Sequence, residues 1–197
     1  MIGADEVNPK VIRLENQWYI MHNISMVSHI GTHIEVPYHL FKDGSDLASF
    51  PLDKLCGEAV VLSLMDVSPQ SAISLKQVQN AAEKSGGIRS GDIVLCNQGR
   101  AHLYGTDEYL QSPYFTTEAL QWLVDKGMKM MGVDATGVEI PGSEEHVNHH
   151  VLLGNGIPLI ENLAGFEKLS KNRIHFYAFP IAVEGLESFP LRAVAIE

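Results

Sequence analysis

Three histidines and one carboxylate lie close together in the segment SHIGTHIEVPYHLF, residues 28–41. They are His29, His33, Glu35 and His39. A single histidine is more often a hydrogen-bonded polar residue than a metal ligand, because imidazole has many other roles. Imidazole combined with carboxylate suits Zn, Mn, Fe or Co, whereas an all-oxygen set suits Mg or Ca. The grouping therefore favours a transition-metal site.

The backbone must bend if these side chains share one ion. Their even spacing would place them on one face of a strand, but in a straight strand His29 and His33 would stand about 13 Å apart. Ligands of one ion lie within a few ångströms of each other. Gly31 permits a bend between them, and Pro37 fixes a second rigid point before His39. Glycine and proline also disfavour a helix, so we expect a kinked loop beside a strand.

Strands and helices alternate in the rest of the chain. Short β-rich apolar runs predict buried strands, over residues 58–66, 91–98, 128–135 and 157–163. Two more strands, over residues 174–185 and 191–197, close the chain with no helix between them. This order predicts an α/β protein with an added antiparallel component.

Three helices are expected between these strands. The first begins at a capping box formed by Ser74 and Gln77, and ends at residues 86–87. The second is capped by Thr116 or Thr117 and ends at Gly127. The third covers residues 144–153 and ends at Gly154.

Length and charge limit the functions that this chain can have. A chain of 197 residues predicts one domain, over residues 1–197. The net charge of -10, with only 14 Lys and Arg, argues against nucleic-acid binding. The opening MIGADEVNPK lacks the basic and apolar regions of a secretory leader, and no apolar run is long enough to span a bilayer. We therefore expect a cytoplasmic protein that does not bind membranes. Cys56 and Cys96 are expected to be free, buried thiols.

Residues 29–39, HIGTHIEVPYH, resemble the HxGTHxDxPxH signature of the cyclase-like metal-dependent hydrolases, which include bacterial kynurenine formamidases and isatin hydrolases. The likeness continues in the same order through GDIVLCNQG, KGMKMMGVDATGVE, HHVLLGNGIPLIENL and FPIAVEGLESFPLRAVA. It implies an α/β fold of the swivelling β/β/α type, with a partly parallel sheet, an antiparallel sheet and flanking helices. It also implies a homodimer or homotetramer.

The resemblance further implies a divalent transition metal, Zn or Mn, as one or two ions. The implied ligands are His29, His33, Glu35, His149 and Glu161, and His39 is the implied proton-transfer residue.

Two features near these residues leave alternatives open. His146 forms an i, i+4 pair with His150 and an i, i+3 pair with His149 on the expected helix, and such pairs can also bind metals. Glu35 stands where the family commonly has Asp, so a role between two ions is not fixed by the resemblance.

The implied reaction is hydrolysis of an amide-type carbon–nitrogen bond in a small molecule, either a formamide or a cyclic amide. A divalent metal can lower the pKa of water from about 16 to about 7 and polarise a carbonyl, while a histidine moves protons. Arg100 is a candidate for binding a substrate carboxylate through its guanidinium fork. Two alternatives to a hydrolase stay open: a non-catalytic metal-binding protein that kept the fold, and a structural oligomeric protein.

Overall fold

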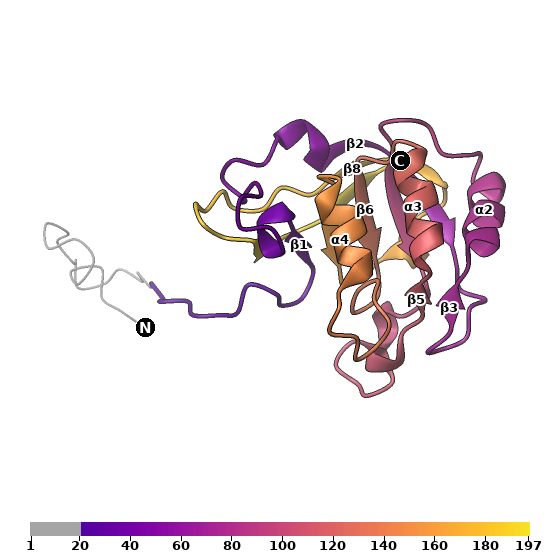
Figure 1. The fold of residues 1–197 in the computed structure, drawn as a ribbon, viewed down its shortest axis with the longest axis horizontal. Coiled ribbons are helices and arrows are strands. Elements are labelled where there is room, and N and C mark those ends of the chain that lie inside the picture. Colours follow the sequence, from indigo (N-terminus) through magenta and orange to yellow (C-terminus); the bar gives the residue numbers. More distant parts are fainter. Residues whose placement is uncertain (1–20) are drawn as a thin grey trace, which may run out of the picture.

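An eight-stranded sheet organises residues 21–197, the part of the chain that the computed structural model describes (Figure 1). From one edge to the other its strands are β10 (Val194–Ile196), β8 (Arg173–Tyr177), β2 (Cys56–Ser63), β4 (Ile93–Asn97), β6 (Met130–Val133), β7 (Leu159–Glu161), β1 (His33–Glu35) and β9 (Ser188–Pro190). The expectations for residues 1–10 lie outside the described residues.

Strand direction divides this sheet into a parallel centre and antiparallel sides. β2, β4, β6 and β7 run parallel, β8 and β10 continue the sheet antiparallel on one side, and β1 and β9 do so on the other. A small second sheet, β3 (Ala72–Ile73) with β5 (Tyr114–Phe115), is parallel. The predicted α/β class with both strand directions is confirmed, and the antiparallel strands belong to the same large sheet as the parallel ones.

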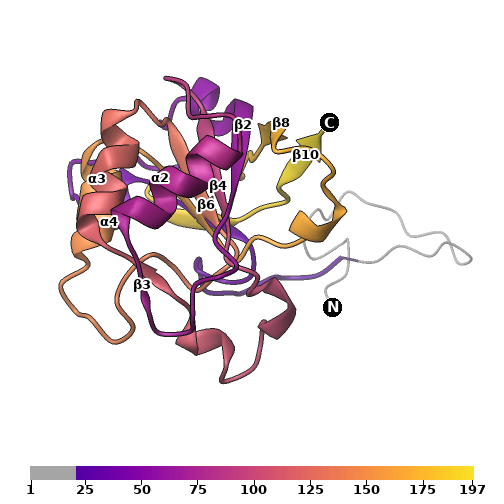
Figure 2. The same cartoon turned by 90° about the vertical axis from the view of Figure 1, so that its right-hand side faces the viewer.

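Three helices, α2 (Leu75–Lys84), α3 (Thr117–Asp125) and α4 (Val147–Gly154), cover one face of the large sheet (Figure 2). Ser74 and Gln77 form the expected capping box at the start of α2. Thr116 caps α3 by accepting the backbone N–H of Ala119, and Gly127 follows its end with φ of +80°. In the described part of the chain, five short 3₁₀ helices connect other elements: Pro37–His39, Leu52–Leu55, Ala101–Leu103, Tyr109–Gln111 and Phe166–Lys168.

The large sheet separates two hydrophobic cores. In β2, Val60 and Leu62 face the helices, while Ala59 and Val61 face the opposite core. That second core is closed by segments that contain short 3₁₀ helices but no α-helix, including residues 47–55 and 163–169. Burial on both faces explains why the parallel strands are continuous apolar runs rather than alternating ones.

Each predicted strand is longer than the observed one, and two differences between predicted and observed elements have a clear local cause. The third helix begins at Val147 rather than at residue 144, because His146 has the left-handed conformation, with φ of +48° and ψ of +38°. The predicted strand over residues 174–185 was wrong beyond Tyr177. Pro180 has no N–H for a strand ladder, and the neighbouring Ile181 is 64% exposed.

Within residues 21–197 the fold has no helix with the length and apolar character needed to cross a membrane. Cys96 is buried, Cys56 is half-buried, and both are free thiols.

Candidate metal centre and active site

Strand pairing between β1 and β7 brings together residues that are far apart in sequence. His33 and Glu35 alternate with Ile34, so they share the face of β1 opposite to it. The antiparallel register pairs His33 directly with Glu161. Ile34 packs into the core away from the helices, so His33, Glu35 and Glu161 project toward the face that carries the helices.

Helix α4 adds a further imidazole to this face. His149 Nε2 lies 3.3 Å from Glu35 Oε2 and 3.5 Å from Glu161 Oε1. His33 Nε2 lies 3.5 Å from Glu35 Oε1 and 3.6 Å from Glu161 Oε2. The side chains of all four residues are at most 9% exposed. Two imidazoles and two carboxylates therefore face one another in a largely buried space.

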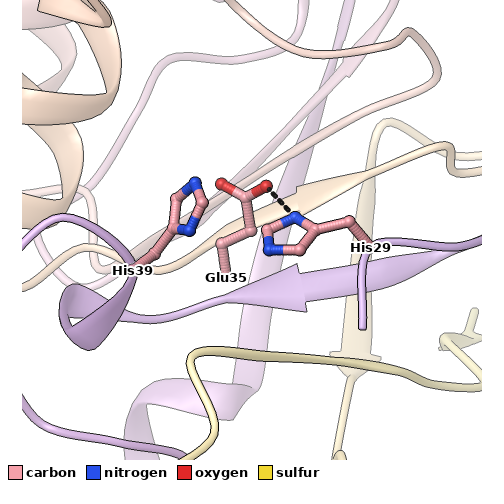
Figure 3. Close-up of side chains that lie close together, drawn as sticks. All are labelled: His29, Glu35 and His39. Carbon is pink, nitrogen blue, oxygen red and sulfur yellow. Dashed lines mark hydrogen bonds and ion pairs between the residues drawn. The ribbon is translucent and has the colours of Figure 1, made fainter. Parts of the chain in front are cut away.

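The predicted bend lies between His29 and His33. Gly31 has φ of +59°, and no atom lies within 4 Å of a Cβ built there, so glycine is required by the backbone conformation rather than by lack of space. The bend returns His29 to the site, where its Nδ1 lies 2.9 Å from Glu35 Oε1 (Figure 3). The expected kinked loop beside a strand is confirmed.

His39 lies at the end of the 3₁₀ turn that begins with Pro37. Figure 3 shows His29 and His39 on either side of the Glu35 carboxylate. The ring centroid of His39 is 4.6 Å from that of His29 and 6.2 Å from that of His149. His39 is thus part of the same site.

We refer to the five expected metal ligands, His29, His33, Glu35, His149 and Glu161, as the ligand cluster. Within the set His29, Glu35 and His39, the donor atoms all lie within 4.8 Å of one another, and the same is true within the set His33, Glu35 and Glu161. Among the described residues, His33 Nε2 and Glu35 Oε2 are buried without a hydrogen-bond partner. Such atoms are costly to bury, and a cation would satisfy both. The imidazole and carboxylate donors fit a divalent transition metal.

The side chains of the ligand cluster shift one another's pKa values. Burial disfavours the charged form of His149, yet the carboxylates of Glu139, Glu161 and Glu35 raise its pKa to about 11. Burial opposes ionisation of Glu35 as well, but the nearby imidazoles of His149, His29 and His33 hold its pKa well below the usual range. Because metal ligands must be deprotonated, metal binding here would displace protons.

The pKa values of the other three histidines at the site, His29, His33 and His39, have the same physical causes. The hydrogen bond to Glu35 raises the pKa of His29. Burial opposes protonation of His33, but its contacts with Glu35 and with the Gly31 carbonyl raise its pKa overall. Burial lowers the pKa of His39, which is therefore a neutral imidazole at neutral pH.

A cavity of about 430 Å³ lies beside the ligand cluster. Its lining is Glu35, His39, Leu110, Ser112, Pro113, Thr136, Gly137, Glu139, Ile140, Pro141, Gly142, Ser143, His146, His149 and Glu161. Three of these side chains are carboxylates, and within residues 21–197 the lining includes no Lys or Arg. A small molecule in this cavity would contact both the ligand cluster and His39.

The remaining candidate residues lie at different distances from this site. His146 lines the cavity but is exposed, and the ring Nδ1 of His150 contacts the His146 carbonyl. The Arg100 guanidinium donates to the Glu108 carbonyl and is not part of the cavity lining. A substrate-binding role for Arg100 stays a prediction that no contact with the cavity supports.

Sequence reasoning missed three polar residues that support the site. Glu139 Oε1 lies 3.0 Å from His149 Nδ1, the ring nitrogen that faces away from Glu35 and Glu161, and Glu187 Oε1 lies 3.2 Å from His29 Nε2. Asn162, at φ of +57°, donates to the Gly31 carbonyl at 3.1 Å and accepts from the Tyr109 hydroxyl. Only Asn162 had a local signal, since asparagine tolerates this conformation after a strand.

Comparison with known proteins identifies the family of this chain. The family model described as "Putative cyclase" matches residues 4–140. The chain belongs to the Cyclase family. This confirms the family suggested by the motif at residues 29–39.

Individual proteins similar to this chain are consistent with this assignment. The chain is 26% identical to a kynurenine formamidase of Bacillus cytotoxicus over 171 residues, which cover 87% of this chain and 77% of the relative. A predicted metal-dependent hydrolase from Bacillus stearothermophilus matches with a TM-score of 0.73 and 26% identity, over 92% of this chain and 83% of the other. Isatin hydrolase A from Labrenzia aggregata shares the fold, with a TM-score of 0.81 and 24% identity over 89% and 76% of the two chains.

Proposed function

We propose that the protein is a metal-dependent hydrolase that cleaves an amide-type carbon–nitrogen bond, in a formamide or a cyclic amide. The observation that carries this proposal is the convergence of three histidines and two glutamates beside a cavity, with two buried donor atoms left without a hydrogen-bond partner within the described residues. Relatives described as a kynurenine formamidase and as a metal-dependent hydrolase support it.

The residues that would hold the metal, Zn or Mn, are those of the ligand cluster. Glu35 directs Oε1 toward His29 and His33 and Oε2 toward His149. A carboxylate with this placement can be shared between two ions, so the cluster has the donors for one ion or two. A bound divalent metal would supply Lewis acidity, which polarises a carbonyl and lowers the pKa of water to about 7.

His39 is the residue that would move protons. It lines the cavity and is half-buried, and burial lowers its pKa, so its neutral imidazole can accept a proton at neutral pH. The attacking water loses one proton as its oxygen bonds to the amide carbon. When the carbon–nitrogen bond breaks, His39 can return that proton to the leaving nitrogen. The net reaction consumes one water and forms a carboxylic acid and an amine.

The cavity lining indicates what kind of amide would fit. Leu110, Pro113 and Ile140 provide apolar contacts, and Glu139, the lining carboxylate outside the ligand cluster, provides negative charge without a lysine or arginine among the described lining residues. An aromatic or cyclic amide without a carboxylate beside Glu139 matches this surface, because a negatively charged substituent there would face a like charge.

The experiment that tests this proposal compares two variants after a screen of the metal-loaded protein against formanilides, isatins, lactams and lactones. His39→Ala should keep its metal and lose about 10²- to 10⁴-fold in turnover, the usual contribution of general acid–base catalysis. His33→Ala should lose the metal itself. His150→Ala, at an exposed position, is the control that should change neither quantity. Unchanged turnover in metal-replete His39→Ala would contradict the role of His39.

One contact favours a second assignment. His39 belongs to a group with His29 and Glu35 whose donor atoms are close enough to hold an ion. As a ligand rather than a base, His39 would suit a non-catalytic metal-binding protein that kept the fold. Loss of metal from His39→Ala, together with no hydrolysis of any screened compound, would support this second function.

A further inference from the structure

Glu139 makes two contacts with one residue of the ligand cluster. Its Oε1 accepts the backbone N–H of His149 at 2.8 Å and lies 3.0 Å from the ring Nδ1 of the same residue. The Glu139 side chain is 14% exposed, and that of His149 is 8% exposed. One carboxylate oxygen therefore fixes both the backbone and the ring of His149.

The ring contact determines which nitrogen can bind a metal. A neutral imidazole has one N–H and one lone pair, and the hydrogen bond made by one nitrogen selects the role of the other. With the Nδ1 hydrogen donated to Glu139, the lone pair belongs to Nε2. That nitrogen faces Glu35 Oε2 at 3.3 Å and Glu161 Oε1 at 3.5 Å.

The backbone contact fixes the start of α4. The first N–H groups of a helix have no partner within the helix, and a capping side chain usually accepts one of them. His146, at the N-cap position, provides no such side-chain hydrogen bond. Glu139 accepts this N–H from outside the helix, and so ties the position of α4 to the position of the His149 ring.

We propose that Glu139 is a positioning residue that selects the Nδ1–H form of His149 and presents Nε2 to the metal. This inference rests on the proposed function. Carboxylates that hold the outer nitrogen of a metal-bound histidine typically contribute about 10- to 100-fold to metal affinity. The alternative is a separate ion bound directly by Glu139, His146 and His149, whose donor atoms also lie within 4.8 Å of one another.

The test measures Zn affinity by chelator competition on the full chain. Glu139→Ala should bind Zn about 10- to 100-fold more weakly, and Glu139→Gln should recover part of the loss because its amide oxygen can still accept both hydrogen bonds. Ser74→Ala removes the cap of α2 instead, and therefore controls for loss of a helix cap away from the site. His146→Ala should leave the affinity unchanged.

A second measurement separates positioning from a merely structural role. In the Zn-loaded protein, long-range ¹H–¹⁵N NMR should show His149 with a hydrogen on Nδ1, and Glu139→Ala should alter this signature. Unaltered Zn affinity in Glu139→Ala would overturn the positioning role of Glu139 but not the proposed function. An equal loss in His146→Ala would overturn it in favour of a separate ion. No metal binding by the unaltered protein would overturn the proposed function as well.

Discussion

Gly137 provides a sharp test of the position of Glu161. This glycine lines the cavity and has φ of +140°, and a Cβ built on it would lie 2.6 Å from Glu161 Oε1. Gly137→Ala should therefore force the Glu161 carboxylate away from its place beside His33 and His149. The atom in conflict is the end of a side chain, so this movement should weaken metal binding more than folding.

Gly142→Ala is the matched control. Gly142 also lines the cavity and has a positive φ of +79°, but no atom lies within 4 Å of a Cβ built there. Both substitutions place a side chain in a strained backbone conformation, at a cost of about 1–3 kcal/mol. At about 2–4 °C per kcal/mol for a chain of this size, each should lower the Tm of the metal-free protein by roughly 2–12 °C.

The two variants should differ only when metal is present. Displacement of one ligand should weaken binding by about tenfold or more, comparable with loss of an outer-shell partner. A tenfold loss corresponds to about 1.4 kcal/mol of metal-induced stabilisation, or roughly 3–6 °C in Tm. Thermal melts with and without Zn or Mn measure this difference. Equal metal-induced shifts in Gly137→Ala and Gly142→Ala would refute the placement of Glu161 in the metal site.

Two further predictions concern pH and substrate charge. The pKa of His149 is raised to about 11, so protonation of His149 stabilises the metal-free protein. This stabilisation is complete below pH 6.5 and decreases as the pH rises from 6.5 toward 11. The free energy of unfolding of the metal-free protein should fall by roughly 1 kcal/mol per pH unit between pH 7 and 9. Melts at several pH values measure this slope, and the same slope in His149→Gln would show that another group causes it. Uncharged formanilides should have a higher kcat/KM than analogues with a carboxylate, because Glu139, the lining carboxylate outside the proposed metal ligands, has no Lys or Arg among the described lining residues to offset its charge. Equal values for the two series would remove the charge argument.

The sequence-predictable part of this site is the part built from local interactions. The bend was predicted from the spacing of His29 and His33, if they share one ion, and from Gly31 between them, and the caps at Ser74 and Thr116 depend on residues only three positions away. These features are local because a turn or a cap is determined within a few residues.

The remaining features depend on contacts between distant segments. Periodicity cannot show that β1 pairs with β7, although this pairing places Glu161 beside His33. Glu139 lies in a loop, where a carboxylate has no spacing that distinguishes it from a solvated residue. The apolar run after Tyr177 was misread as strand for a related reason, because tertiary context determines whether Phe179 and Ile181 pair in a sheet or lie exposed.

The central claim is that the ligand cluster, His29, His33, Glu35, His149 and Glu161, binds a divalent metal. The most direct measurement is a calorimetric titration of chelator-stripped protein with Zn or Mn, checked by elemental analysis after dialysis. Saturation at one or two ions per chain is expected, with loss of at least one tight site in both His33→Ala and His149→Ala. Absence of tight binding in the unaltered protein, or unchanged binding in both variants, would contradict the account.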